Sequence, residues 1–310
     1  MLKTIINTCY KVTNKSKYIT INYENIEKFS KNIKNIELKH WLSDSPFGLL
    51  ELPTETIINF LLIYESINFS FWGTPKWTIT TKEGELDGSI ALLYALLKYV
   101  KENNTTDFSN LTKEEFRNIL KGNIEIPLFN KRYNIIKSTS KIVNNKMNGN
   151  FYQYIKNITI DTKLFDIIIK NFPSFKDERT YNNDTIKLYK LAQLLTSDIL
   201  HIRELKENIE VDYSNLIGCA DYKIPQILRW LDLVTYNSEL ANIVDSEQEI
   251  KENSIYEVEI RASQLIVINK IKEILGPKTK SIDINDYLFL QKNNKNIKLK
   301  PYHLTRTTNY

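Results

Sequence analysis

Apolar residues recur at helical spacing along most of this chain. Ile26, Phe29, Ile33 and Ile36, for example, form one apolar stripe within a helical lead-in over residues 1–39. Similar patterns, bounded by Gly, Pro and Asn-rich turns, predict helices through the rest of the sequence. These predicted helices begin at 54 and continue at 90–100, 111–122, 132–142, 151–158, 162–169, 188–203, 256–274 and 284–290.

Segments with strand character are few. Trp77–Thr81 is rich in β-favouring residues and predicts a short strand. Residues 87–89 predict a turn or a helix start, and residues 181–184 predict a turn. The chain is therefore expected to be mainly α with minor β, its helices packed around one or two connected cores. We expect a single domain over residues 1–310, with a soft Asn-rich link near 144–150 between two helical subdomains.

The segment Cys219–Gln226 separates two predicted helices. The first is short, beginning near Asp212 and ending at Gly218, because Gly commonly follows the C-cap of a helix. The second is amphipathic, with an apolar stripe from Ile224 to Leu231. Polar residues in the connection are therefore held close to the start of a helix.

Asp221 is placed at the start of the second helix, with Pro225 still within its first turn or so. A carboxylate there faces the positive end of the helix dipole and is expected to stay ionised. Asp also serves routinely as an N-cap. Local evidence alone favours the capping role over a chemical one.

Composition and charge are those of an ordinary globular protein. The chain has 310 residues, of which 42% are hydrophobic and 25% charged, and its net charge of +5 reflects 42 basic against 37 acidic residues. No basic stripe or tail is present, which argues against a stable nucleic-acid partner. The longest apolar run, Ile57–Tyr64, is too short to span a bilayer.

Cysteine and histidine are too sparse to predict a metal site. Cys9 and Cys219 lie far apart, the histidines are His40, His201 and His303, and no CxxC or HExxH motif occurs. The sparse cysteines fit a reduced, cytoplasmic compartment, and Met1–Tyr10 resembles neither a secretory signal nor a transit peptide. We therefore expect a cytoplasmic protein without metal or redox cofactor.

Several polar residues stand in aromatic or turn-rich segments where a helix bundle would not need them. They are His40 beside Trp41, Asp87, Asp177, and Asp221 beside Tyr222. No Ser-His-Asp order, phosphate loop or GxGxxG motif accompanies them. Carboxylates with aromatic rings suit a pocket that stacks a flat ring and stabilises a cation, as in glycosidic bond cleavage. Buried aromatic residues are, however, more often plain core.

An ordered set of motifs is more specific than these single residues. The motifs are Phe71–Trp77, Asp87–Ser89, Phe172–Asp177, Tyr189–Gln193 with Asp198, Ala220–Gln226, Glu257–Ala262 and Tyr302–Arg306. In this order, from about His40 to Tyr310, the chain resembles the queuosine salvage family, the queuosine 5′-phosphate N-glycosylase/hydrolases. It departs from the family pattern at Leu191, at Cys219 in place of Phe, and at Lys223 in place of Arg.

The resemblance implies a helical fold like that of the DNA glycosylases, of the helix-hairpin-helix type. It also implies hydrolysis of queuosine 5′-monophosphate to queuine and ribose 5-phosphate, with a small-molecule nucleotide as the partner. Queuine is a 7-deazapurine and lacks the N7 that a purine hydrolase usually protonates. Catalysis must then depend on stabilising the ribosyl cation and positioning water.

The resemblance assigns the catalytic role to Asp221. Asp177 is expected to make a polar contact to the base, with Phe175 and Tyr222 stacking on its faces. Ordinary core packing is an equal alternative for Phe175. Asp87 is expected to form a turn.

Three further residues are candidate ligands of the 5′-phosphate, namely Lys190, His303 and Arg306, because a guanidinium fork matches phosphate oxygens. A tail docked by surface contacts is the alternative for the last two. His40 is a candidate for the diol or the ribose, with a surface histidine as the alternative. Glu257, Glu259 and Arg261 are expected to form an ion-pair network that braces the fold.

Two rival functions remain open at this point. A non-catalytic binder of queuine or of queuosine-modified tRNA would bind without hydrolysis, although the modest charge disfavours tRNA. A DNA-repair glycosylase would need a basic duplex-binding face and a wedge residue, and neither is evident in the sequence. The oligomeric state and the preference between nucleotide and nucleoside also stay open.

Overall fold

The computed structural model describes every residue except 1, 34–39, 45, 83 and 292–297. Helices dominate the described residues. They are α1 (Leu2–Thr13), α2 (Tyr23–Ile33), α3 (Thr54–Ser66), α4 (Gly88–Asn103), α5 (Lys113–Ile119), α6 (Phe129–Lys146), α7 (Phe151–Ile155), α8 (Asp161–Asn171), α9 (Lys190–Glu207), α10 (Lys223–Trp230), α11 (Ser238–Asp245), α12 (Ile255–Leu275) and α13 (Ser281–Leu290), with 3-10 turns η1 (Trp41–Asp44), η2 (Leu49–Glu51) and η3 (Pro173–Phe175).

Small antiparallel sheets accompany these helices. β1 (Ile19–Ile21) pairs with β6 (Val234–Tyr236), which ties the N-terminal segment to the C-terminal third of the chain. Two hairpins complete the strands of the described residues: β2 (Thr78–Thr81) with β3 (Gly84–Asp87), and β4 (Glu178–Tyr181) with β5 (Asp184–Lys187). The prediction of a mainly helical chain with minor β is confirmed.

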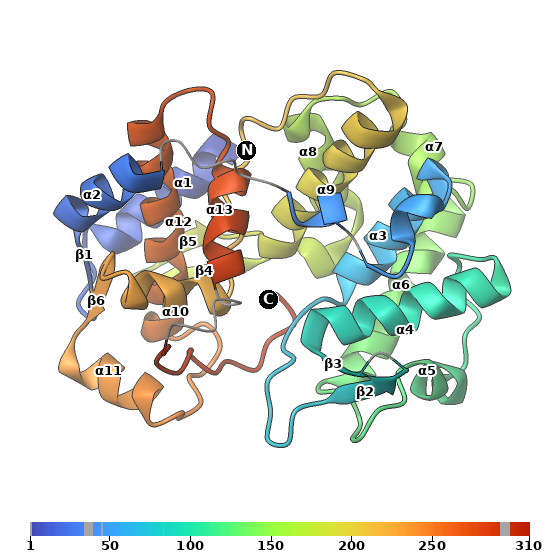
Figure 1. The fold of residues 1–310 in the computed structure, drawn as a ribbon, viewed down its shortest axis with the longest axis horizontal. Coiled ribbons are helices and arrows are strands. Elements are labelled where there is room, and N and C mark those ends of the chain that lie inside the picture. The colour runs from blue at the N-terminus through green and yellow to red at the C-terminus, as the bar shows by residue number, and fades with distance from the viewer. Residues whose placement is uncertain (1, 34–39, 45, 83, 292–297) are drawn as a thin grey trace.

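The helices form two groups that meet near the C-terminus (Figure 1). One group contains α3–α9, and the other contains α1, α2 and α10–α13. The long helix α12 is buried along most of its length, and its apolar residues contribute to two hydrophobic cores. The larger core joins α3–α9 to α1 and one side of α12, while the smaller core lies on the other side with α2, α10, α11 and α13.

Most predicted helices are present with shifted ends. The expected strand at 77–81 corresponds to β2, and the turn expected at 181–184 joins β4 to β5. At residues 87–89 the helix start is the alternative that is confirmed, because Asp87 ends β3 and α4 begins at Gly88. Of the first apolar stripe, Ile36 falls outside the described residues, and Ile26, Phe29 and Ile33 lie on α2. Helical periodicity was therefore a sound guide to where helices form.

The helix predicted between Asp212 and Gly218 is wrong. Asp212 instead forms a parallel bridge with Ile160, at the edge of α8. The amide N–H groups of Ile217 and Gly218 donate to Oε1 of Gln193, at 2.7 and 3.2 Å. Because a buried side chain and an isolated β-bridge satisfy these backbone groups, they do not need helical hydrogen bonds.

The predicted soft link at 144–150 comprises the end of α6 and a turn into α7. Asn144 donates to Asp107 at 3.0 Å, and Asn150 both caps α7 and donates to Glu55 at 2.7 Å. Val143 and Phe151 on either side of it belong to the same core. The division into subdomains at this point stays a prediction, as does the single domain.

The last ten residues run between the two groups of helices without forming a helix (Figure 1). They pair with the connection after α3, because the amide of Ser70 donates to the carbonyl of Tyr310 at 2.8 Å. The indole of Trp72 likewise donates to the carbonyl of Thr305, at 3.0 Å. The tail therefore belongs to the interior of the fold, which is where the candidate site lies. Among the described residues, no helix has the length and apolar character needed to cross a membrane.

Candidate active site

Asp221 lies immediately before α10 and is only 8% exposed. Its Oδ1 accepts the backbone N–H groups of Lys223 and Ile224, at 3.0 and 2.9 Å. The expected capping role is thus confirmed, because both donors belong to the first turn of α10. These amides and the helix dipole stabilise the charged form of the carboxyl group.

Two side chains of α12 fix the backbone that carries Asp221. Oε1 of Gln264 accepts the N–H of Asp221 at 3.1 Å, and its Nε2 donates to the carbonyl of Cys219. Arg261 donates from Nε to the carbonyl of Ala220 at 2.9 Å. A buried helix therefore sets the position of the carboxylate, which is the preorganisation that electrostatic catalysis requires.

Tyrosine rings gather beside Asp221. The ring centroid of Tyr222 is 5.0 Å from that of Tyr302 and 6.4 Å from that of Tyr310. The ammonium of Lys223 lies 3.8 Å from the ring centroid of Tyr302, a cation–π distance. Tyr222 and Tyr302 are half-buried, so their rings are partly accessible. Tyr302 was not among the site residues predicted from the sequence, although the terminal motif begins with it.

Arg306 brings a cation to the same side of the fold. Its guanidinium carbon lies 3.4 Å from the ring centroid of Trp72, and Nη1 donates to the carbonyl of Trp72 at 2.9 Å. The side chain is half-buried and makes no ion pair with any residue that the structure describes. Of the three predicted phosphate ligands, Arg306 is the one that stands against Trp72 in the tail segment between Tyr302 and Tyr310, and it has no ion-pair partner among the described residues.

His303 is unsuited to binding phosphate by charge. It is buried, and burial together with the charge of Arg261 lowers its pKa to about 3, so the ring is neutral at pH 7. Its Nε2 lies 3.3 Å from the hydroxyl of Tyr310. Its Nδ1 is buried without a hydrogen-bond partner among the described residues. The alternative of an exposed docked tail also does not describe this residue.

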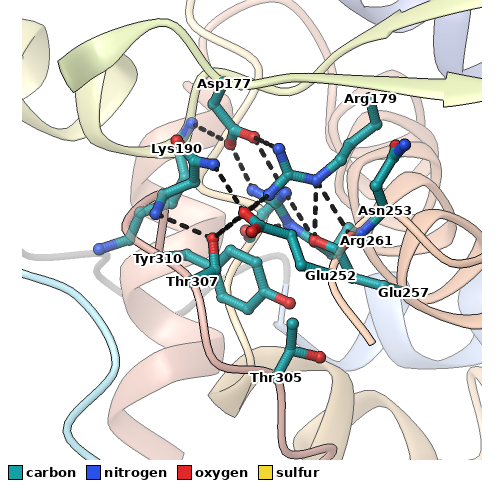
Figure 2. Close-up of polar contacts among 12 residues, drawn as sticks. Asp177, Arg179, Lys190, Glu252, Asn253, Glu257, Arg261, Thr305, Thr307 and Tyr310 are labelled. Carbon is teal, nitrogen blue, oxygen red and sulfur yellow. Dashed lines mark hydrogen bonds and ion pairs between the residues drawn. The ribbon is translucent and has the colours of Figure 1, made fainter. Parts of the chain in front are cut away.

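Asp177 lies in a buried ion-pair network (Figure 2). Arg261 donates to both of its oxygens, with Nη1 at 3.1 Å from Oδ1, and Arg179 lies 3.3 Å from Oδ1. Glu257 pairs with both arginines, at 3.0 and 3.2 Å. Burial by itself raises the pKa of Asp177, but the charge of Arg261 lowers it, and this pKa lies below its ordinary value. Both oxygens of this carboxylate are thus paired with arginines, which favours a bracing role, and the contact to the base stays a prediction.

The predicted bracing network on α12 is confirmed for Glu257 and Arg261. Glu259 acts differently, because it accepts hydrogen bonds and forms no ion pair among the residues that the structure describes. Its donors are the hydroxyl of Ser16 at 2.6 Å, the amide of Tyr18 at 2.9 Å and the hydroxyl of Tyr181 at 2.9 Å. Glu259 therefore anchors the connection between α1 and β1 to α12.

Phe175 is part of the larger hydrophobic core and is fully buried in η3. Its ring packs edge-on against Phe172, with centroids 6.2 Å apart. The alternative of ordinary core packing therefore describes its environment. A stacking role on the base would require this ring to leave well-packed neighbours.

His40 is buried, so the alternative of a surface histidine is wrong. Its ring stacks on His201 at 4.0 Å, and its Nε2 lies 3.1 Å from the hydroxyl of Ser197 and 3.4 Å from Oδ1 of Asp198. Burial holds the pKa of His40 well below its ordinary value. The neutral ring is thus fixed against α9 and an acidic side chain.

Asp198 belongs to a buried acidic pair that sequence reasoning did not include in the site. Its partner is Glu65 near the end of α3, and their carboxyl groups hydrogen-bond each other. The sequence did contain an indication of this pair. Glu65 lies in the apolar stretch of α3, and a carboxylate is rarely buried among apolar residues without a partner. Lys190 is close to this pair, since its charge lowers the pKa of both acids. A phosphate would be repelled there, which argues against Lys190 as a phosphate ligand.

The structure thus separates the predicted residues into neighbouring sets. Asp221, Tyr222 and Arg306 lie where the tail meets α10 and the connection after α3, while His40 and Lys190 lie with the acidic pair on α3 and α9. Within the described residues, no group of three or more His, Cys, Asp or Glu side chains is arranged to hold a metal ion.

Comparison with known proteins identifies relatives along most of the chain. A family model described as queuosine salvage protein matches residues 50–310. A protein of Sphaerobacter thermophilus is 29% identical over 265 residues, covering 83% of this chain and 82% of the relative. A Bos taurus protein is 28% identical over 280 residues, with 83% and 82% covered, and a Dictyostelium discoideum protein is 24% identical over 319 residues, with 96% of each covered. All three are named queuosine 5′-phosphate N-glycosylase/hydrolase.

Proposed function

Because this chain belongs to the queuosine salvage protein family, we propose that it hydrolyses the N-glycosidic bond of queuosine 5′-phosphate. The products are queuine and ribose 5-phosphate. The observation that carries this proposal for the chain itself is Asp221, a carboxylate fixed by two amides of α10 beside partly accessible tyrosine rings. Cleavage of a nucleotide through a ribosyl cation needs a fixed negative charge and flat surfaces for the base.

Asp221 is proposed to face the ribose. Positive charge develops at C1′ as the bond to the base stretches, and a carboxylate held in place stabilises that charge without reorganising. The same carboxylate positions a water molecule and accepts its proton as the oxygen bonds to C1′. Gln264 and Arg261 act by holding the backbone on either side of Asp221.

The tyrosines and Arg306 supply binding. Tyr222 and Tyr302 offer half-buried rings against which a heterocycle stacks. The guanidinium of Arg306 is proposed to hold the 5′-phosphate, since it is cationic, half-buried and oriented by Trp72. Lys223 lies close enough to Tyr302 to add a second positive charge to this side.

The wider assignment follows from the same family. We place the protein among helical folds related to the DNA glycosylases, in the cytoplasm, acting on a small-molecule nucleotide without metal or redox cofactor. A stable nucleic-acid partner is not part of the proposal, because the net charge of +5 is modest for a 310-residue chain.

The direct test incubates the purified protein with queuosine 5′-phosphate and follows queuine and ribose 5-phosphate by mass spectrometry. Equimolar release of both products is expected. A parallel reaction with the dephosphorylated nucleoside measures how much the phosphate contributes. Tight binding of queuine or of queuosine-bearing tRNA without product release, by a protein shown to be folded, would refute hydrolysis and favour a binding protein.

A further inference from the structure

Glu65 on α3 and Asp198 on α9 form a carboxyl pair in the interior. Both residues are 0% exposed. Oε1 of Glu65 and Oδ2 of Asp198 receive no N–H or other O–H donor from the described residues, yet the two carboxyl groups hydrogen-bond each other. Two carboxylates bond in this way only by sharing a proton.

The remaining oxygens of the pair have fixed donors. The indole of Trp41 donates to Oδ1 of Asp198 at 2.9 Å, and His40 lies 3.4 Å from the same atom. The side-chain amide of Asn68 donates to Oε2 of Glu65 at 3.0 Å. These contacts hold both carboxyl groups so that their other oxygens face each other.

The surroundings favour the protonated state. Burial raises the pKa of Glu65 to about 7 and that of Asp198 well above its ordinary value, and the two charges oppose each other. The pair therefore keeps a proton at neutral pH. The titratable and charged groups that face it from the packed elements are Tyr64 on α3, Lys190 on α9, His40 before η1, Asp286 on α13 and Cys219 in the connection to α10.

A separate observation indicates that a ligand belongs beside the pair. Lys190 is 8% exposed, and its ammonium makes no hydrogen bond or ion pair with any residue in the described part of the chain. Its charge nevertheless lowers the pKa of Glu65 and of Asp198. Lys190 thus places a cation without a partner among the described residues near two acids that it does not contact, and a polar group of a bound ligand would bridge them.

The pair is also close to the segment that carries Asp221. The charges of Asp221, Asp198 and Lys190 all act on the buried thiol of Cys219, two residues before Asp221. Asp221, Lys190 and the pair therefore all lie near Cys219. In glycosidic cleavage, two acids held in opposite protonation states take the roles of acid and base.

We propose that Glu65 and Asp198 jointly hold the proton that the departing base takes up, with Lys190 as a donor to a polar atom of that base. This inference rests on the proposed function and adds the acid that the 7-deazapurine needs. The bond between C1′ and the base nitrogen breaks and its electron pair goes to the base, which receives the shared proton. Water forms the new bond to C1′, and its proton passes through Asp221 to solvent, from which the pair is reprotonated.

A substrate that needs no acid tests this assignment. In 4-nitrophenyl riboside 5-phosphate, the nitrophenolate leaves without being protonated. Glu65→Gln and Asp198→Asn should each lower kcat for queuosine 5′-phosphate by roughly 100-fold or more, while kcat for the nitrophenyl substrate stays near the wild-type value. Asp221→Asn should lower both. Glu207→Gln, a carboxyl group on α9 paired with Arg203, is the matched control and should change neither.

Equal losses on the two substrates, or no loss on either, would overturn the proposal. If neither substrate is cleaved by the folded wild-type protein, it is the proposed function that fails. The wild-type protein provides a second test that does not depend on the folding of a variant. Its kcat for queuosine 5′-phosphate should fall as the pH rises above about 7, while kcat for the nitrophenyl substrate should not fall in that range. Parallel pH profiles would contradict a shared proton that serves the leaving base.

Discussion

Asp177→Asn separates a bracing role for Asp177 from a role in binding the base. The substitution keeps the size of the side chain but removes its charge from between Arg261 and Arg179. Both arginines are nearly or completely buried, so each is left with one fewer counter-charge in a medium that stabilises charge poorly. Removing one partner of a buried ion pair costs about 3–5 kcal/mol.

The contacts that remain place the expected loss near the lower end of that range. Glu257 still pairs with Arg179 at 3.0 Å and with Arg261 at 3.2 Å. Two buried cations then share one buried anion, with Glu252 at 3.2 Å as a partly exposed second partner of Arg179. We expect Asp177→Asn to lower the free energy of unfolding by about 3 kcal/mol at pH 7.

The assay is urea unfolding of both proteins over a range of pH. The pKa of Asp177 lies below its ordinary value of 3.8, so its carboxylate stabilises the fold above that pH. This contribution is lost as the pH falls from about 3.8 through the lower value in the folded state. The difference between wild type and variant should therefore shrink in acid. Glu24→Gln, which breaks an exposed pair with Lys28, is the control and should leave unfolding unchanged.

A loss below about 1 kcal/mol would refute the bracing role, because it would equal the effect of a surface ion pair. A variant that kept its stability but bound queuosine 5′-phosphate far more weakly would also contradict a bracing role. That result would restore the direct contact to the base that the family resemblance implied for Asp177.

Other positions give independent expectations. Arg306→Ala should raise KM for queuosine 5′-phosphate by roughly tenfold or more with little change in kcat, because a charge-assisted hydrogen bond contributes about 1.5–3 kcal/mol; an unchanged KM in steady-state kinetics would exclude it as the phosphate ligand. Thr112→Ala removes the capping box that Thr112 forms with Glu115 at the start of α5 and should lower the free energy of unfolding by about 1 kcal/mol, measured by urea titration. Burial raises the pKa of Glu65 from 4.5 to about 7, so wild-type stability should decline as the pH rises from 4.5 to about 7 and level off above that, and Glu65→Gln should flatten the decline. Equal pH dependence in the two proteins would contradict a protonated Glu65.

Features set by neighbours in sequence were predictable. The cap formed by Asp221 and the helix that follows it depend on a carboxylate two and three residues before the amides it accepts, together with a regular apolar stripe. The end of α12 before Gly276 is equally local. Periodicity and capping therefore located most helices and the likeliest place for a fixed carboxylate.

Features that depend on distant contacts were not predictable in this way. Gln193 captures the amides of Ile217 and Gly218, which removes a helix that the local pattern favoured. Asp177 and Arg261 lie far apart in sequence, and nothing near Asp177 indicates that its charge is already neutralised. Similarly, the pairing of Glu65 with Asp198 requires α3 to pack on α9. The family motifs include Asp177, Arg261 and Asp198, but a motif does not show which of its side chains can contact a substrate and which are already paired.

Asp221→Asn is the sharpest test of Asp221 as the catalytic carboxylate. Asn is as good an N-cap as Asp, so α10 and the fold should be retained while the negative charge is lost. Asp212→Asn, an exposed aspartate on the same segment that accepts the amide of Ser214, is the matched control. Under single-turnover conditions, we predict that the wild-type protein and Asp212→Asn release queuine from queuosine 5′-phosphate, whereas folded Asp221→Asn releases essentially none. Release at the wild-type rate by Asp221→Asn would contradict the account.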